Sequence, residues 1–227
     1  MKKNIITGNF VKMLMTCFMI IFIFVFADCK KINQENTENG LQTTLTFVKG
    51  SVMINEKKAR TGDIIENVVT ISTGESSLCE IMFGKNNIIQ FQSNTIATLN
   101  FESLVKEVEL KTGSIASILK GLEQNPEKDS FRVRSNTTVA GVRGTTFFVQ
   151  TDGKKTYVCD CNGSVNVSDL DNKHSELLKN LHHGARVFLM VNGKLKVEEG
   201  SLQYHDDKMM ADLATKIGYK LDWQKLD

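Results

Sequence analysis

Apolar and polar residues alternate along most of this chain between Leu45 and about Gly200. The alternating runs are short, rich in valine, isoleucine, threonine and phenylalanine, and separated by residues that favour turns, a pattern typical of β-strands with one buried face. Leu78–Phe83 and Ile88–Phe91 are clear examples, joined by Gly-Lys-Asn-Asn, a sequence that suits a tight turn. Because strand follows strand without helical periods between them, the pattern predicts a mainly β body.

A Gly-Ser pair opens an apolar run at three places in this body. The three sequences are Gly50-Ser51-Val52, Gly113-Ser114-Ile115 and Gly163-Ser164-Val165. Their spacings of 63 and 50 residues are unequal, so a solenoid with a fixed repeat is excluded. We expect an antiparallel β-roll or sandwich of many short strands in which corresponding strands start from similar corners. We also interpret Asn162-Gly163 as a hairpin turn.

The C-terminal part predicts a hairpin and one amphipathic helix. Asn192-Gly193, between the runs Ala185–Val191 and Lys194–Val197, indicates a type I′ turn. His205-Asp206-Asp207 can cap a helix that ends near Gly218. We expect this helix to cover a sheet edge, with a partner-binding helix as the alternative. The residues expected on its apolar face are Met209, Met210, Leu213 and Ile217, and Trp223 is expected to pack back on the domain.

The N-terminus has the pattern of an export signal. Lysines at positions 2, 3 and 12 precede Met13–Ala27, which is apolar except for one threonine, and Cys29 follows. Fifteen uncharged residues suit a signal-peptide core and fall short of the roughly 20 needed to cross a bilayer. We therefore expect residues 1–28 to be a lipoprotein signal and Cys29 to be acylated, although Asp28 and Phe26 depart from the usual lipobox. The alternative is an uncleaved anchor that starts nearer Phe10.

Three further segments follow the predicted signal. Residues 29–44 are rich in Asn, Gln and Glu without an apolar period, which predicts a flexible tether. Residues 45–200 form the predicted β domain, and residues 201–227 form the helical segment.

The charge of the chain argues against nucleic-acid binding. The chain has 28 basic and 26 acidic side chains, and removal of residues 1–28 leaves 25 of each. A neutral protein without a basic block lacks the charge that binds phosphate backbones.

Several sequences in the β domain resemble the FecR family. The resemblance covers roughly residues 46–168, and its most specific part is the run Val142-Arg143-Gly144-Thr145-Thr146-Phe147-Phe148-Val149. It implies a β-rich domain of the cell envelope. The family is named for a periplasmic protein that relays an iron-siderophore signal to a sigma factor. Only about a dozen residues precede the apolar segment here, too few for a cytosolic sigma-binding domain, so we do not expect that regulatory role.

Residues of the family pattern are expected to be structural. The likeness covers Arg143, Gly144 and Thr145, together with Gly62 and Asp63. Arg143 can pair with a carboxylate such as Asp63, and Gly144 permits a close backbone approach.

A candidate metal site comes from four other residues, Cys159, Cys161, His182 and His183. Residues i and i+2 of a strand face the same way, so both thiols are expected on one face within about 7 Å of each other. Two thiolates and one or two imidazoles suit zinc or a copper ion. The alternatives are inert buried thiols and a disulfide, for which Cys79 is the expected partner of one of the pair. His174 and His205 are expected to be solvated.

The sequence thus favours a binding, sensing or scaffold lipoprotein of the cell envelope. It carries none of the common hydrolase, protease or nucleotide-binding motifs, so we do not expect an enzyme. We expect membrane attachment through Cys29, at the periplasmic face or the outer membrane, with a protein, glycan or peptidoglycan partner that the sequence does not identify. The alternative function is a metal- or haem-handling envelope protein that uses the Cys/His cluster directly.

Overall fold

The computed structural model describes residues 42–84, 86–120, 122, 131–142 and 144–226. The chain divides into two compact units, Met1–Gly40 and Leu41–Asp227, and the described residues all belong to the second. The predicted signal, Cys29 and nearly all of the predicted tether lie outside the described residues. Within the described ranges, no helix is long and apolar enough to span a membrane.

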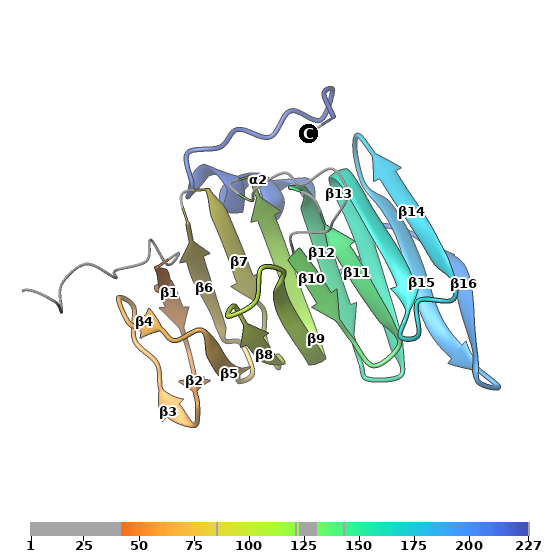
Figure 1. Ribbon diagram of the computed structural model, residues 1–227. Coiled ribbons are helices and arrows are strands. Elements are labelled where there is room, and N and C mark those ends of the chain that lie inside the picture. The colour runs from red at the N-terminus through yellow and green to blue at the C-terminus, as the bar shows by residue number, and fades with distance from the viewer. Residues whose placement is uncertain (1–41, 85, 121, 123–130, 143, 227) are drawn as a thin grey trace, which may run out of the picture. The chain divides into compact units, whose positions relative to one another are not determined.

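The described part of the chain is mainly β, as the alternation predicts (Figure 1). It contains sixteen strands and one helix, and the first strand begins two residues before the expected start of the domain. The strands are β1 (Thr43–Lys49), β2 (Val52–Ile54), β3 (Lys57–Lys58), β4 (Ile64–Ile65), β5 (Val68–Thr73), β6 (Leu78–Phe83), β7 (Asn87–Phe91), β8 (Ile96–Asn100), β9 (Lys106–Leu119), β10 (Phe131–Arg134), β11 (Thr138–Val142), β12 (Thr146–Thr151), β13 (Lys155–Asp169), β14 (Ser175–Asn180), β15 (Gly184–Val191) and β16 (Lys194–Gly200), and the helix is α2 (Asp207–Thr215).

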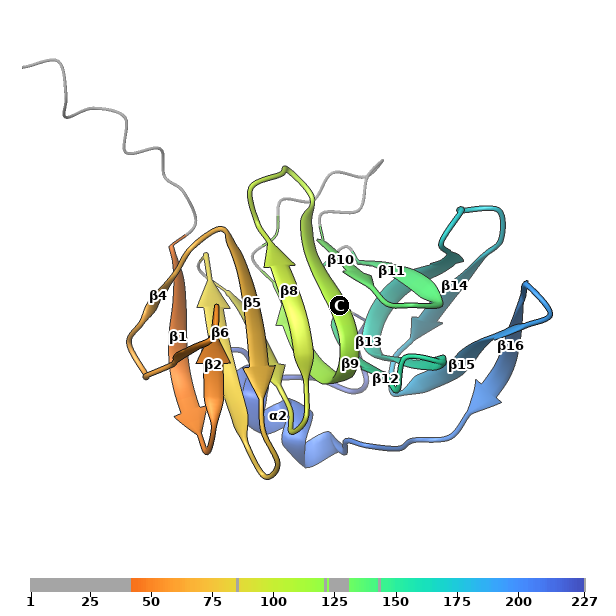
Figure 2. The same ribbon diagram turned by 90° about the horizontal axis from the view of Figure 1, so that it is seen from below.

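The strands form two layers, sheet A and sheet B (Figure 2). Sheet A has the order β4-β1-β6-β7-β9-β12-β13-β15-β16. Sheet B has the order β3-β2-β5-β8-β9-β10-β11-β13-β14. Among the described strands, only the β9–β10 pair is parallel. The long strands β9 and β13 belong to both sheets, because each bends partway along its length from one layer into the other. The result is the expected roll.

The Gly-Ser pairs mark the corners where the chain passes between the two sheets. At each corner the glycine has a positive φ, and a hydroxyl from a neighbouring corner occupies the space that a Cβ would need. The same hydroxyl accepts a hydrogen bond from the N–H of the serine that follows. The three bonds join Ser51 N to Ser77 Oγ (2.8 Å), Ser114 N to Thr95 Oγ1 (3.0 Å) and Ser164 N to Thr145 Oγ1 (3.0 Å).

The structure corrects one turn prediction and confirms another. Asn162-Gly163 is not a hairpin, because β13 continues through Gly163, whose φ of 133° bends the strand into the second sheet. Asn192-Gly193 does form the predicted tight turn between β15 and β16, with φ values of 51° and 73°.

Two apolar clusters stabilise this arrangement. The larger one fills the space between the sheets and includes Phe83 and Phe131, whose ring centroids lie 6.1 Å apart. The smaller one lies on the outer face of sheet A, beneath α2. Because the sheet is covered on both faces, all five residues of β7 are buried, including the polar Asn87 and Gln90.

Helix α2 begins where the sequence predicts but covers a different part of the sheet. Asp206 is its N-cap, and the carboxylate accepts a hydrogen bond from Met209 N at 2.7 Å. Met210 and Leu213 pack on the outer face of sheet A against Ile88 of β7 and Ile118 of β9. The expectation that the helix covers a sheet edge is therefore wrong. The helix instead buries apolar side chains on the outer face of sheet A.

Candidate cysteine–histidine metal site

Two thiols project together from the outer face of sheet A. Cys159 and Cys161 lie in β13, and both are fully buried. The pairing of β13 with β12 shifts at this point, since Phe147 pairs with Asp160 and Thr146 pairs with Asn162. Cys161 is thus the extra residue of a β-bulge, a feature that re-aims side chains. The sulfur atoms lie 3.7 Å apart, closer than the roughly 7 Å expected of same-face neighbours in a regular strand.

Two imidazoles complete the cluster from other segments. His183 lies in the corner between β14 and β15, and its Nδ1 is 3.5 Å from Cys159 Sγ. His205 lies between β16 and α2, and its Nε2 is 3.3 Å from Cys161 Sγ. The four donor atoms all lie within 4.8 Å of one another.

Three of the six donor separations match the edges of a zinc tetrahedron. With Zn–S bonds of about 2.3 Å and Zn–N bonds of about 2.0–2.1 Å, tetrahedral geometry places neighbouring donors about 3.3–3.8 Å apart. The Cys159–Cys161, Cys159–His183 and Cys161–His205 separations fall in this range.

In each imidazole, one ring nitrogen faces the thiols and the other has a hydrogen-bond partner that holds the ring in this orientation. His183 Nε2 lies 2.8 Å from Asp207 Oδ1, and His205 Nδ1 donates to the carbonyl of Gln203 at 2.8 Å. The ring of His205 also stacks on Phe148, with centroids 4.4 Å apart. Partners of this kind, a carboxylate and a backbone carbonyl, typically orient histidines that bind metals.

The electrostatics of the thiol pair favour a bound cation. A hydrogen bond from Cys161 lowers the pKa of Cys159 to about 4, and His183 and His205 contribute to this shift while burial opposes it. Burial, reinforced by Cys159, raises the pKa of Cys161 well above its usual value. Burial alone would lower the pKa of His183, but its bonds to Cys159 and Asp207 raise it. These shifts favour a thiolate at Cys159, and a bound ion would displace the proton from Cys161.

The predicted ligands fall into two groups of converging donors, the four-donor cluster and a more exposed group of His182, His183 and Asp207. His182 is not part of the four-donor cluster, since its Nε2 instead contacts Asp207 at 3.0 Å on the exposed side. His205, expected to be solvated, is a cluster member and only 9% exposed, because the C-terminal segment folds back over sheet A. His174 is exposed and pairs with Asp169, in agreement with the solvated position expected for it.

The three described cysteines are free thiols. Cys79 packs in the core between the sheets, whereas Cys159 and Cys161 face outward from sheet A. The alternative of a disulfide between Cys79 and one of the pair does not hold, because the two sites lie on opposite faces of the sheet.

The family-pattern residues that the structure describes have structural contacts. Thr145 is buried and donates to the carbonyl of Asn162 at 2.7 Å, next to Gly144, whose φ is 78°. Gly62 N donates to Leu45 O at 2.8 Å, and Asp63 Oδ2 accepts from Arg60 N at 2.8 Å within the same turn. Arg143, and with it the predicted pairing to Asp63, lies outside the described residues.

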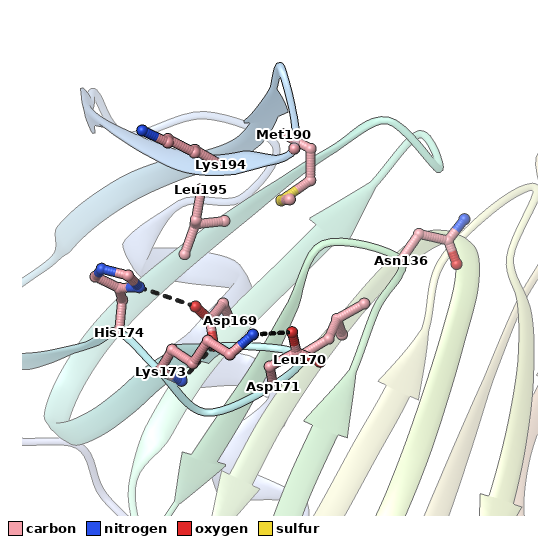
Figure 3. Close-up of a pocket in the computed structure, with 10 residues that line it drawn as sticks. Asn136, Asp169, Leu170, Asp171, Lys173, His174, Met190, Lys194 and Leu195 are labelled. Carbon is pink, nitrogen blue, oxygen red and sulfur yellow. Dashed lines mark hydrogen bonds and ion pairs between the residues drawn. The ribbon is translucent and has the colours of Figure 1, made fainter.

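A cleft of about 680 Å³ lies at the other end of the roll, between the β13–β14 turn and the β15–β16 hairpin (Figure 3). Two pairs of its charged side chains are in contact, His174 with Asp169 at 3.1 Å and Lys173 with Asp171 at 2.9 Å. The cleft is larger than the cysteine–histidine cluster, but it gathers no buried reactive group. The chemistry of the described residues is concentrated at the cluster.

The paired strands and the glycine corners define a two-layer β-roll. Residues 69–166 match the family described as FecR protein. A search of curated proteins found no match.

Similar solved structures include two crystal structures of a "putative anti-sigma factor" from Parabacteroides distasonis ATCC 8503. Both are 17% identical to this chain with a TM-score of 0.47. The matches cover 60% and 59% of this chain, and the chain spans 62% and 61% of the two structures.

Proposed function

We propose that this protein is a FecR-type sensing module of the bacterial cell envelope that holds one zinc ion at Cys159, Cys161, His183 and His205. The observation that carries the zinc proposal is the convergence of four donor atoms within 4.8 Å of one another. The FecR domain at residues 69–166 supports the sensing role, and the apolar segment ahead of Cys29 supports attachment to the envelope.

The donor set favours zinc over copper or haem. Two thiolates and two imidazoles in a tetrahedron are a common structural zinc set. Copper electron-transfer sites use one cysteine, two histidines and a weak axial ligand, and here a second cysteine stands in place of that ligand. Haem iron takes at most two axial ligands from the protein, so four converging donors suit a single ion.

Burial argues for a non-enzymatic site. Cys159 and Cys161 are fully buried, and the four side-chain donors would together complete the coordination of a tetrahedral ion. Catalytic zinc keeps one position open for water or substrate, whereas structural zinc is closed. A cysteine nucleophile would also need access to substrate, which neither thiol has.

The direct test is metal analysis of the full chain purified without a histidine tag. We expect about one equivalent of zinc per chain, as in four-ligand structural sites, and its loss in Cys161→Ser and His205→Ala. Cobalt(II) in place of zinc should give the visible absorption of tetrahedral thiolate coordination.

Two histidine variants serve as controls. His174→Ala, an exposed histidine remote from the cluster, should retain the zinc, and His182→Ala should retain it as well. Wild-type protein without stoichiometric zinc would refute the proposed site. Zinc loss in His182→Ala but not in His205→Ala would replace the proposed ligand set with the one expected from sequence.

A further inference from the structure

The cluster joins three segments that are far apart in the sequence. Cys159 and Cys161 come from the middle of β13, and His183 comes from the corner between β14 and β15. His205 comes from residues 201–226, which follow the last strand and which we call the C-terminal segment. An ion bound to all four ligands would therefore link the roll to the C-terminal segment.

Both ends of the C-terminal segment meet at the cluster. At its start, His205 directly precedes the N-cap Asp206, and Asp207 of the first helical turn bonds to His183. At its end, the ring of Trp223 lies 5.2 Å from that of His183. The side chain of Asn162, next to Cys161 in β13, donates to the carbonyls of residues 222 and 225 at 3.2 and 2.9 Å.

Between these ends the segment is held by a short helix, by apolar contacts with the outer face of sheet A and by one ion pair. Helix α2 has nine residues, fewer than an isolated helix needs for stability in water, because the first turn is costly to form. Its fully buried side chains are Met210, Leu213 and Ala214. Lys216 adds an ion pair to the buried Glu80 of β6, at 2.7 Å for Oε2. An ion that fixes His205 beside the N-cap would hold the first turn of α2 in place.

We propose that the zinc ion fastens the C-terminal segment to sheet A, so that metal occupancy controls whether the outer face of the sheet is covered. This inference rests on the proposed zinc site. With zinc bound, the segment covers Ile88, Ile118 and Phe148. Without zinc, the segment detaches, and this apolar face becomes exposed while the two-layer roll remains folded.

Hydrogen–deuterium exchange of the full chain, with zinc and after chelation, tests the proposal. Peptides from residues 205–226 should exchange at least about tenfold faster without zinc, because their protection then reports local opening. Peptides from β5, in the sheet remote from the cluster, should not change. The chain has a single tryptophan, so the emission of Trp223 should also shift to longer wavelength on chelation, as its ring leaves the two histidines.

Variants separate the role of the ion from the role of the segment. Cys161→Ser lies outside the C-terminal segment, yet it should reproduce the effect of chelation in the presence of zinc. His174→Ala should keep the zinc-dependent protection of the wild type.

Each contrary outcome has a definite meaning. If zinc binds stoichiometrically but the segment is equally protected with and without it, the fastening role is refuted and the zinc site stands. If β5 loses protection together with the segment, the ion holds the whole fold and the local role is refuted. If no zinc binds, the proposed function itself fails.

Discussion

Asp207 connects the chemistry of the cluster to the start of helix α2. Its carboxylate accepts from both His182 and His183, at 3.0 and 2.8 Å, and these bonds lower its pKa although desolvation opposes the shift. In the first turn of the helix, its negative charge also interacts favourably with the unpaired N–H groups. One side chain therefore contacts one proposed ligand, His183, and lies in the helix that begins two residues after another, His205.

Replacement of Asp207 by asparagine should weaken zinc binding without removing a ligand. We expect Asp207→Asn to lower the zinc affinity about 10–100-fold, the range found for partners of metal-binding histidines. Competition with a chromophoric chelator measures this change. Asp212→Asn is the matched control, because Asp212 lies on the same helix and pairs only with Lys208 on the exposed side. Equal affinities of the two variants would contradict the orienting role.

At the scale of elements, the corners of the roll are the most constrained positions. A Cβ at Gly113 would lie 2.3 Å from Thr95 Oγ1 and 2.4 Å from Thr95 Cα, and the φ of +91° is itself unfavourable for other residues. Gly193 also has a positive φ, of +73°, but a Cβ added there would meet no atom within 4 Å. A comparison of the two glycines therefore separates the free-energy cost of the left-handed backbone conformation from the cost of steric overlap with a neighbour.

Alanine at these two glycines should have unequal effects on stability. Gly193→Ala should lower the free energy of unfolding by about 1–2 kcal/mol, the cost of the left-handed conformation. Gly113→Ala should lower it by about 3 kcal/mol or more, because overpacking at Thr95 is added. Urea denaturation measures both values. Similar losses in the two variants would show that the corner can relax around a methyl group.

Most of the elements could be predicted from sequence, because alternation, turn residues and the N-cap are local signals. The hairpin at Asn192-Gly193 and the start of α2 at Asp207 follow from such signals. The bend at Gly163 does not, because it depends on Thr145 from a neighbouring corner. A local pattern does not distinguish a glycine that turns the chain back from one that bends a strand.

The candidate site was predictable only in part. Cys159, Cys161 and His183 stand out by residue type and by their positions near one strand. His205 lies 44 residues after Cys161, and nothing local marks it as a ligand. His205 reaches the thiols only because the C-terminal segment folds back across the outer face of sheet A. The sequence predicts a helix at the edge of the sheet and does not predict this path. The bulge at Cys161 likewise requires knowledge of the pairing with β12.

On the scale of the whole molecule, two parts of the chain are expected to have different roles. The N-terminal part attaches the protein to the membrane, and the β-roll with its C-terminal segment carries the cysteine–histidine cluster. The residues that match the FecR family form the centre of the roll, and the cysteine–histidine cluster lies on the outer face of sheet A. The predicted lipid on Cys29 and the tether up to residue 44 would place this unit at a membrane surface.

Mass spectrometry of the N-terminal peptide tests this attachment. Protein isolated from the membrane fraction should begin at Cys29 and carry acyl chains, because the signal ahead of it is removed. Cys29→Ser should abolish acylation and leave the signal uncleaved. An unmodified Cys29 in a wild-type chain that retains residues 1–28 would refute the lipoprotein prediction and favour an uncleaved anchor.

Strand β9 has a consequence for the order in which this chain can assemble. All strands before it pair among themselves or with β9, so residues 43–119 contain every partner needed for the first half of both layers. As synthesis proceeds from the N-terminus, β9 would present two open edges at once, one for β10 and one for β12. Strands β10 to β16 can then add to a sheet edge that β9 already provides. The residues of the cysteine–histidine cluster, at positions 159–205, are synthesised after this edge has formed.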